Sequence, residues 1–178
     1  MKQPVLSIVI IESDIGEGIS RTLQCLLNQT VCDQIELVIA STRPPELRAS
    51  VDQEAFFSLR HVRLHALGSP AQARVKAVRA ASGRFILFAE DHAFPGPHCV
   101  ERLIGSMQGN SAAVGPAIEN ANPRSLVSWA NLFMGFGPWI RAKQSGSVPH
   151  LPPQNSAYRR DVLVAFGDEL EQLLDQEL

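Results

Sequence analysis

Three side chains that can bind a cation follow one another near the middle of the chain. Residues 85–88 are all large and apolar, which is typical of a buried strand, and Glu90, Asp91 and His92 come one residue later. In open α/β sheets, ligands bind just beyond the carboxyl ends of the strands. Glu90 and His92 are two residues apart, so in extended chain they project to the same side and can hold a divalent metal. The alternative is that Glu90 and Asp91 mark only the solvated start of a loop.

The elements that must position these side chains alternate between strands and helices. Apolar runs predict strands at 5–11, 35–41, 61–65, 85–89 and 112–118. Helical spacing, caps and breakers predict helices at 15–28, 45–52, 70–82, 97–107, 125–136 and 168–178. This alternation favours an α/β fold, a three-layer α/β/α sandwich with a mainly parallel sheet. We expect one domain over residues 1–178, with a first half at 1–118 and a second half at 119–178.

Composition and charge exclude several classes of protein. The chain has 178 residues, of which 45% are hydrophobic, and this suits one domain with a sizeable core. The net charge of −2, with acidic and basic residues interspersed, gives no electrostatic case for binding nucleic acid. No apolar run has the length of a membrane span. Cys25, Cys32 and Cys99 have no paired spacing and are expected to be reduced thiols in a cytoplasmic protein.

Five segments of the chain match a known pattern when they are taken in order. They are Leu6–Ile10, Ile35–Ile39, Pro70–Arg74, the run from Ala80 through the Glu-Asp-His triplet, and Leu151–Arg160 with its sequence LPPQNSAYRR. This order resembles the nucleotide-sugar glycosyltransferases of family 2, which have the GT-A fold. The resemblance runs from about Pro4 to the C-terminus. It implies an inverting glycosyltransferase whose first half binds the nucleotide sugar and whose second half lies on the acceptor side.

The resemblance also implies roles for the triplet. The family has an Asp-x-Asp motif that contacts the metal and the ribose, and here its three positions are Glu90, Asp91 and His92. Glu90 is then expected near the ribose or the metal, and His92 is expected to be a metal ligand through a ring nitrogen. Exchange of a carboxylate for an imidazole favours Mn²⁺ or another transition ion over Mg²⁺.

Further donor-site residues follow from the same alignment. Arg74 occupies the place of an arginine that lines the nucleotide pocket in the family. Glu12 follows the first strand and is a candidate pocket residue, although it could equally cap the next helix. Ser41 replaces an aspartate that commonly contacts the donor base, and its hydroxyl can still form a hydrogen bond. We take UDP as the default nucleotide and leave GDP or another nucleotide open.

The catalytic base is expected in an acidic segment at the end of the chain. The resemblance places Asp175 in the position of the base, with Glu177 and Glu171 as rivals. The alternative is that all three are exposed helix charges. The final helical segment has no cap or stop signal, and we therefore expect a chain that is truncated relative to the family.

The implied partners are a nucleotide-sugar donor and an acceptor that the sequence does not specify. The acceptor is a glycan, a lipid-linked molecule or a small molecule, and nucleic acid is not expected. Since lipid-linked acceptors are common in the resembled family, peripheral association with the inner face of a membrane stays open. A second reading is a non-catalytic nucleotide-binding or interaction module with the same fold.

Overall fold

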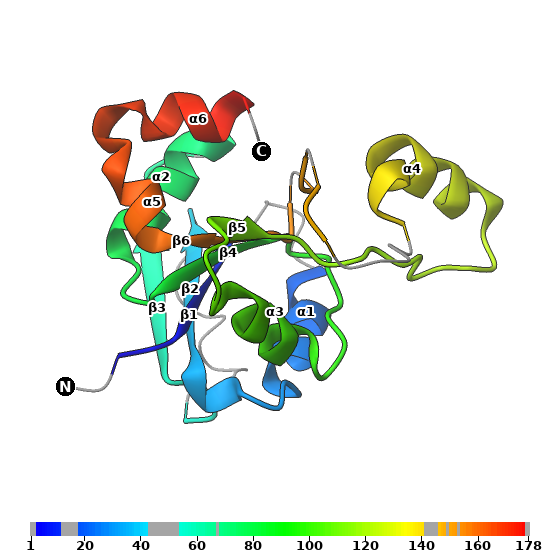
Figure 1. Ribbon diagram of the computed structural model, residues 1–178, viewed down its shortest axis with the longest axis horizontal. Coiled ribbons are helices and arrows are strands. Elements are labelled where there is room, and N and C mark those ends of the chain that lie inside the picture. The colour runs from blue at the N-terminus through cyan, green and yellow to red at the C-terminus, as the bar shows by residue number, and fades with distance from the viewer. Residues whose placement is uncertain are drawn as a thin grey trace.

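The computed structural model describes residues 3–11, 18–42, 54–66, 68–140, 146–148, 150–152 and 154–176. Within these residues, six strands form one sheet in the order β3-β2-β1-β4-β6-β5 (Figure 1). Neighbours among β3, β2, β1 and β4 are parallel, and β6 is antiparallel to both β4 and β5. The strands are β1 (Leu6–Ile11), β2 (Ile35–Ser41), β3 (Ser58–Arg63), β4 (Phe85–Ala89), β5 (Ala113–Val114) and β6 (Ala157–Arg159).

Helices cover both faces of the sheet. The α-helices are α1 (Gly18–Leu27), α2 (Pro70–Ala80), α3 (Cys99–Met107), α4 (Leu126–Phe136), α5 (Arg160–Ala165) and α6 (Leu170–Gln176). One apolar core joins α1 and α3 to one face, and a second joins α2, α5 and α6 to the other. The expected three-layer α/β/α sandwich with a mainly parallel sheet is therefore confirmed. Helix α4 lies apart from these layers (Figure 1).

Helix α2 illustrates how local sequence sets an element. The Ser69 side chain accepts a hydrogen bond from the Gln72 N–H at 3.2 Å, and Pro70 occupies the first turn, as the sequence predicts. The helix buries Ala71, Ala73, Val75, Ala77 and Val78. These small side chains let α2 pack closely on the sheet, which brings its first turns to the carboxyl edge of the parallel strands.

Several predicted boundaries are wrong. The strand expected at 61–65 is Ser58–Arg63, and only Ala113–Val114 of the run 112–118 is strand. No sequence signal predicts β6, because three residues are too few to establish an alternating pattern. This strand depends on its neighbours β4 and β5, with which it forms an antiparallel ladder. The short helix expected at 45–52 lies outside the described residues.

A buried carboxylate ties the strands together at the amino edge of the sheet. Glu36 is fully buried, accepts hydrogen bonds from the Ser7 hydroxyl and from the N–H and hydroxyl of Ser82, and lies 3.5 Å from Arg60 Nε. Burial acts to raise the pKa of Glu36, but the hydrogen bonds and the Arg60 charge outweigh it and hold the pKa below its ordinary value of 4.5. Glu36 is therefore a satisfied structural anion, on the edge opposite the predicted site.

Candidate active site

The triplet lies where β4 ends, at the carboxyl edge of the sheet. Ala89, the last residue of β4, pairs with Ile10 of β1, so the triplet begins between two central parallel strands. The Glu90 and Asp91 side chains are 18% and 17% exposed, whereas the His92 side chain is 67% exposed. The two carboxylates therefore lie at the base of the site, and the imidazole covers them from the solvent side.

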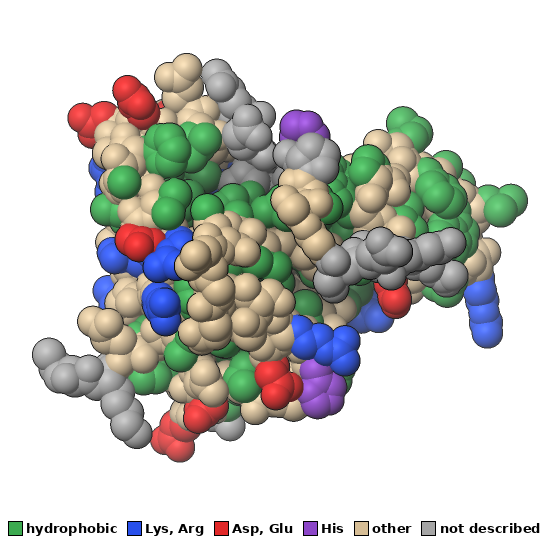
Figure 2. All heavy atoms as spheres, viewed as in Figure 1, with side chains coloured by type: hydrophobic (Ala, Val, Ile, Leu, Met, Phe, Trp, Pro, Cys, Tyr) green, Lys and Arg blue, Asp and Glu red, His purple; other side chains and the backbone are tan. Residues whose placement is uncertain are grey.

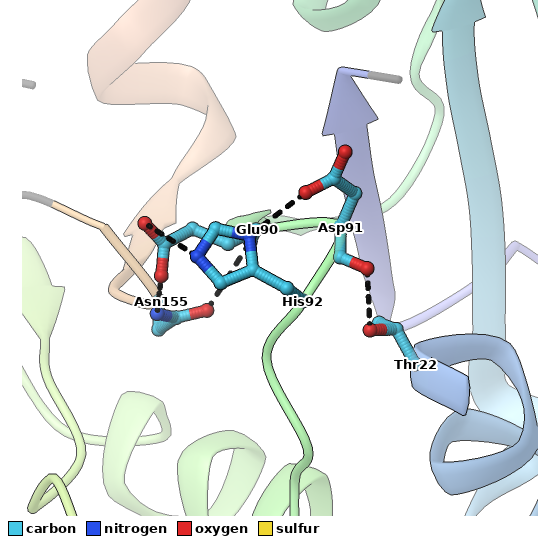
Figure 3. A network of polar contacts seen from close by, with 5 residues as sticks. All are labelled: Thr22, Glu90, Asp91, His92 and Asn155. Carbon is cyan, nitrogen blue, oxygen red and sulfur yellow. Dashed lines mark hydrogen bonds and ion pairs between the residues drawn. The ribbon is translucent and has the colours of Figure 1, made fainter. Parts of the chain in front are cut away.

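The side chains of Glu90 and His92 face each other across a turn, in which the Ala93 N–H donates to the Glu90 carbonyl oxygen at 3.2 Å, and not in the extended chain that their spacing assumed. His92 Nε2 lies 3.9 Å from Glu90 Oε1, and His92 Nδ1 lies 2.8 Å from Asp91 Oδ1 (Figure 3). The imidazole thus stands between two carboxylates, and each ring nitrogen faces an oxygen. Such a group can present a ring nitrogen to a cation.

Asn155 holds Glu90 in place from the segment before β6. Its Nδ2 donates to Glu90 Oε2 at 3.2 Å, and its Oδ1 accepts from the Glu90 N–H at 3.3 Å (Figure 3). The Asn155 N–H donates to the Phe88 carbonyl oxygen at 2.7 Å, and the residue has a φ of 61°. Asparagine tolerates this left-handed conformation better than most residues. Glu90 Oε2 is therefore anchored, and Oε1 is left facing His92.

Helix α1 fixes the loop that follows the triplet. The Thr22 hydroxyl donates to the Asp91 carbonyl oxygen at 2.8 Å (Figure 3). The buried Gln29 amide donates to the Gly96 carbonyl oxygen at 2.9 Å and accepts from the Val100 N–H at 3.0 Å. The start of the loop is thus tied to α1, and its end is tied to Gln29, two residues after α1 ends, which positions the triplet against the sheet.

Arg74 supplies positive charge beside the triplet. It is partly buried on α2, where Nη1 donates to the Leu174 carbonyl oxygen at 3.5 Å and the guanidinium lies 5.9 Å from the centre of the Phe88 ring. Burial lowers the pKa of Arg74, whereas its interactions with Tyr158 and Glu90 act in the opposite direction. Since an arginine stays protonated in proteins, this group is a fixed cation near Glu90.

Ser41 lies at the same edge of the sheet, and its hydroxyl is hydrogen-bonded to a side chain of the neighbouring strand. It is buried at the end of β2, and its Oγ lies 2.8 Å from His61 Nε2 on β3. One strand, β1, separates β2 from β4. Ser41 can therefore line a donor pocket, but its hydroxyl already has a hydrogen-bond partner.

Of the candidates Asp175 and Glu177 for the catalytic base, the structure describes only Asp175. Asp175 is exposed on α6, one residue after Leu174, whose carbonyl oxygen accepts from Arg74. The ion pairs of His92 found among the described residues are with Glu90 and Asp91, and none is with Asp175. Glu177 and the pocket candidate Glu12 lie outside the described residues.

The donor set fits a divalent cation only in part. Two protein ligands, each about 2.1 Å from one ion, lie about 3.0–3.4 Å apart, so the 3.9 Å between Glu90 Oε1 and His92 Nε2 must shorten slightly. No cluster of three or more His, Cys, Asp or Glu side chains suited to a metal occurs in the described part of the chain. Glu90 and His92 could thus supply two ligands, and a bound diphosphate or water would have to complete the shell.

The sequence analysis included Asn155 and Tyr158 only as parts of the segment LPPQNSAYRR and gave them no role. The signal for Asn155 was its place in a run of polar residues directly before a chain reversal, where a left-handed asparagine is common. Thr22 gave no signal, because its hydroxyl contacts a backbone atom 69 residues away.

Comparison with known proteins identifies the family to which the chain belongs. A family model described as glycosyl transferase family 2 matches residues 7–166. The chain therefore belongs to glycosyl transferase family 2, as its motifs predict. Among curated proteins, none matches the chain by sequence.

Solved structures with the same fold include TarS and a mannosyltransferase. TarS 1–349 from S. aureus has a TM-score of 0.68 at 15% identity, with 97% of this chain and 54% of that chain covered. The mannosyltransferase PcManGT from Pyrobaculum calidifontis, in complex with GDP-Man and Mn²⁺, has a TM-score of 0.71 at 17% identity, with 93% and 47% covered. TarS 1–349 in complex with UDP-GlcNAc gives 0.65 at 14% identity, with 92% and 47% covered.

At these identities the likeness concerns the fold, which is that of GT-A glycosyltransferases. The chain spans about half the length of these structures. None of the helices in its described residues is long and apolar enough to cross a bilayer.

Proposed function

We propose that this protein transfers a glycosyl group from a nucleotide-diphosphate sugar to an acceptor hydroxyl, with inversion and with the help of a divalent metal. The observation that best supports this is the facing pair of Glu90 and His92, with Arg74 close by, at the carboxyl edge of the sheet. A cation site and a fixed guanidinium at that edge are what a diphosphate leaving group requires.

Each group then has one task. Glu90 and His92 hold Mn²⁺ or Mg²⁺, which when bound offsets the charge of the departing diphosphate. Arg74 adds positive charge on the nucleotide side. Ser41 contacts the nucleoside, Glu12 stays a candidate from the sequence for the same role, and Asp91 orients the His92 ring through the 2.8 Å contact with Nδ1.

The bond changes define the need for a base. The bond between the anomeric carbon and the diphosphate oxygen breaks, a bond from that carbon to the acceptor oxygen forms on the opposite face, and the nucleoside diphosphate leaves. The proton of the acceptor hydroxyl goes to a carboxylate. Asp175 or Glu177 is proposed for this role.

The partners and the compartment belong to the same proposal. The donor is a UDP sugar or a GDP sugar, and the acceptor is a glycan, a lipid-linked molecule or a small molecule. The three cysteines have no paired spacing in the sequence, which fits a reducing cytoplasmic setting.

The test is a thermal-shift titration with Mn²⁺ and a panel of nucleoside diphosphates. Wild-type protein is expected to gain stability with Mn²⁺ plus UDP or GDP, and Glu90→Ala/His92→Ala protein is expected to lose this gain. A matched control is His98→Ala/Glu101→Ala, which removes an exposed histidine–carboxylate pair of 3.0 Å outside the site. A double variant that keeps the full shift would exclude the triplet as the site.

A second candidate is a nucleotide-binding module without turnover. It is favoured by the exposure of Asp175 on α6, where no ion pair or hydrogen bond that would hold this carboxylate toward the triplet is found among the described residues. Release of nucleoside diphosphate from a nucleotide sugar, measured with and without acceptors, separates the two: binding without release identifies the module.

A further inference from the structure

Helix α4 is an apolar element that the rest of the molecule leaves in solvent. It has eleven residues, of which none is buried and none is charged. The exposed fractions are 86% for Leu126, 70% for Val127, 59% for Phe133 and 85% for Met134. Figure 2 shows hydrophobic side chains gathered over this part of the molecule, away from the layered body. An exposed apolar surface of this kind marks a place of contact with another apolar surface.

The apolar side chains nearly encircle the helix. Ser128, Asn131 and Gly135 are three and four residues apart and form one narrow strip at 3.6 residues per turn. The other eight residues of α4 are apolar and cover the remaining circumference. A protein partner packed on one side would leave much of this surface in water, whereas a lipid interface covers all of it except the polar strip.

The charge beside α4 suits an anionic surface. Residues 120–140, all of them described, contain no Asp or Glu, and their one charged side chain is Arg124. Arg124 is exposed and precedes the capping residue of α4. Basic residues beside an apolar helix are attracted to anionic lipid headgroups.

A second copy of the chain is a poorer occupant. A helix of eleven residues is about 16 Å long and about 10 Å wide, so it offers roughly 500 Å² of lateral surface, and a helix pair would bury about half of that. Stable interfaces bury about 800 Å² per partner. A contact through α4 alone is therefore too small for a dimer.

The helix is also braced at its base. Ile118 forms a bridge with Ile140, and the Ile118 N–H donates to the Trp139 carbonyl oxygen at 3.0 Å. Trp129 stacks on Phe133 with ring centres 5.6 Å apart, and its Nε1 donates to the Pro123 carbonyl oxygen at 2.9 Å. The segments that enter and leave α4 are thus joined by the bridge between Ile118 and Ile140, beneath the apolar helix. Tryptophan at such positions is typical of a membrane interface.

We propose that α4 inserts into the headgroup–acyl boundary of a bilayer that contains anionic lipids and holds the domain at the membrane surface. The helix lies in the plane of the interface, because about 16 Å is half the thickness of a hydrocarbon core. Its apolar side chains enter the acyl region, and Arg124 lies among the headgroups. This inference does not depend on the sugar chemistry proposed above.

The experiment measures partitioning of the full chain onto lipid vesicles by co-sedimentation. The vesicles are pure phosphatidylcholine, or phosphatidylcholine and phosphatidylglycerol in a three-to-one ratio. Wild-type protein is expected to bind the anionic vesicles more tightly than the neutral ones. Leu126→Gln/Met134→Gln protein is expected to bind at least tenfold more weakly, since two side chains more than four-fifths exposed are removed from the inserted surface.

Controls keep the test decisive. Val162→Gln/Val164→Gln changes two exposed apolar side chains on α5 of the layered body, and its binding to vesicles is expected to equal that of wild type. Circular dichroism and melting temperature establish that the α4 variant is folded. Equal binding by the α4 variant, or absence of wild-type binding to either vesicle, overturns the proposal. So does a wild-type dimer that the α4 variant dissociates, because the occupant is then a second copy.

Discussion

Replacement of Asn155 isolates the contribution of one side chain to the geometry of the triplet. Asn155 combines a left-handed backbone with two hydrogen bonds to Glu90, one to the carboxylate and one to the N–H. Asn155→Gly removes both bonds without backbone strain, and Asn155→Ala removes them and adds strain at φ 61°. The two variants therefore separate the effect of the side chain from that of the backbone.

The magnitudes follow from these contacts. Each hydrogen bond contributes about 0.5–1.5 kcal/mol, so Asn155→Gly is expected to lower the free energy of unfolding by about 1–2 kcal/mol, toward the lower end because Glu90 is partly exposed. Asn155→Ala is expected to lose about 1 kcal/mol more, because a left-handed residue with a Cβ costs about that amount. Asn155→Asp tolerates the backbone but puts a second carboxylate against Glu90.

The assay is urea unfolding in metal-free buffer, followed by thermal shift with Mn²⁺ and UDP. The Gly and Ala variants are both expected to lose most of the ligand-dependent shift, since Glu90 Oε2 is no longer anchored. Asn110→Gly, which changes an exposed asparagine between α3 and β5, serves as the control. If Asn155→Gly keeps wild-type stability and the full shift, Asn155 does not position Glu90 and the reasoning fails.

Three further predictions concern the amino edge of the sheet and the cation beside the triplet. Glu36→Gln should lower the free energy of unfolding by about 2–4 kcal/mol at pH 7, because a hydrogen-bonded buried anion is lost. In urea unfolding at a series of pH values, this difference from wild type should shrink as the pH falls below 4.5 and through the lower pKa of Glu36 in the folded protein. Gly83→Ala should cost about 1–3 kcal/mol by thermal and urea unfolding, since a Cβ there would lie 2.6 Å from the Ser7 nitrogen. Arg74→Met should weaken UDP binding at least tenfold by calorimetry, equal to about 1.4 kcal/mol, while vesicle binding stays unchanged.

Much of the sheet could be predicted from the sequence because its central strands are buried on both faces. Residues 6–10, 35–41 and 85–88 are buried throughout, so each is a mainly apolar run, although Ser7, Glu36 and Ser41 are polar. These strands depend on periodicity within a few residues, which a sequence displays directly. Glu90 and His92 face each other for another reason, because a turn closed by the Ala93 N–H and the Glu90 carbonyl oxygen brings them together.

Features that depend on distant partners could not be predicted in this way. The strand Ala157–Arg159 exists only through its ladders with β4 and β5. Asn155 and Thr22 contact the triplet across 65 and 69 residues of sequence. The helical pattern at 125–136 predicted α4 correctly, but such a pattern is equally typical of a buried helix, and its exposure is a property of the whole fold.

The two charged clusters of the sheet lie at opposite edges, and this separation has a measurable consequence. Glu36 pairs with Ser7, Ser7 pairs with Ile86, and Glu90 comes four residues after Ile86, so the clusters are about 13 Å apart along the strands at about 3.3 Å per residue. Substitutions more than about 7–10 Å apart without shared partners usually add within about 0.5 kcal/mol. The combination of Glu36→Gln and Asn155→Gly should therefore lower the unfolding free energy by the sum of the single effects. A coupling above about 1 kcal/mol would mean that the amino-edge network also sets the geometry of the triplet, and stability and chemistry would then not be separable in this fold.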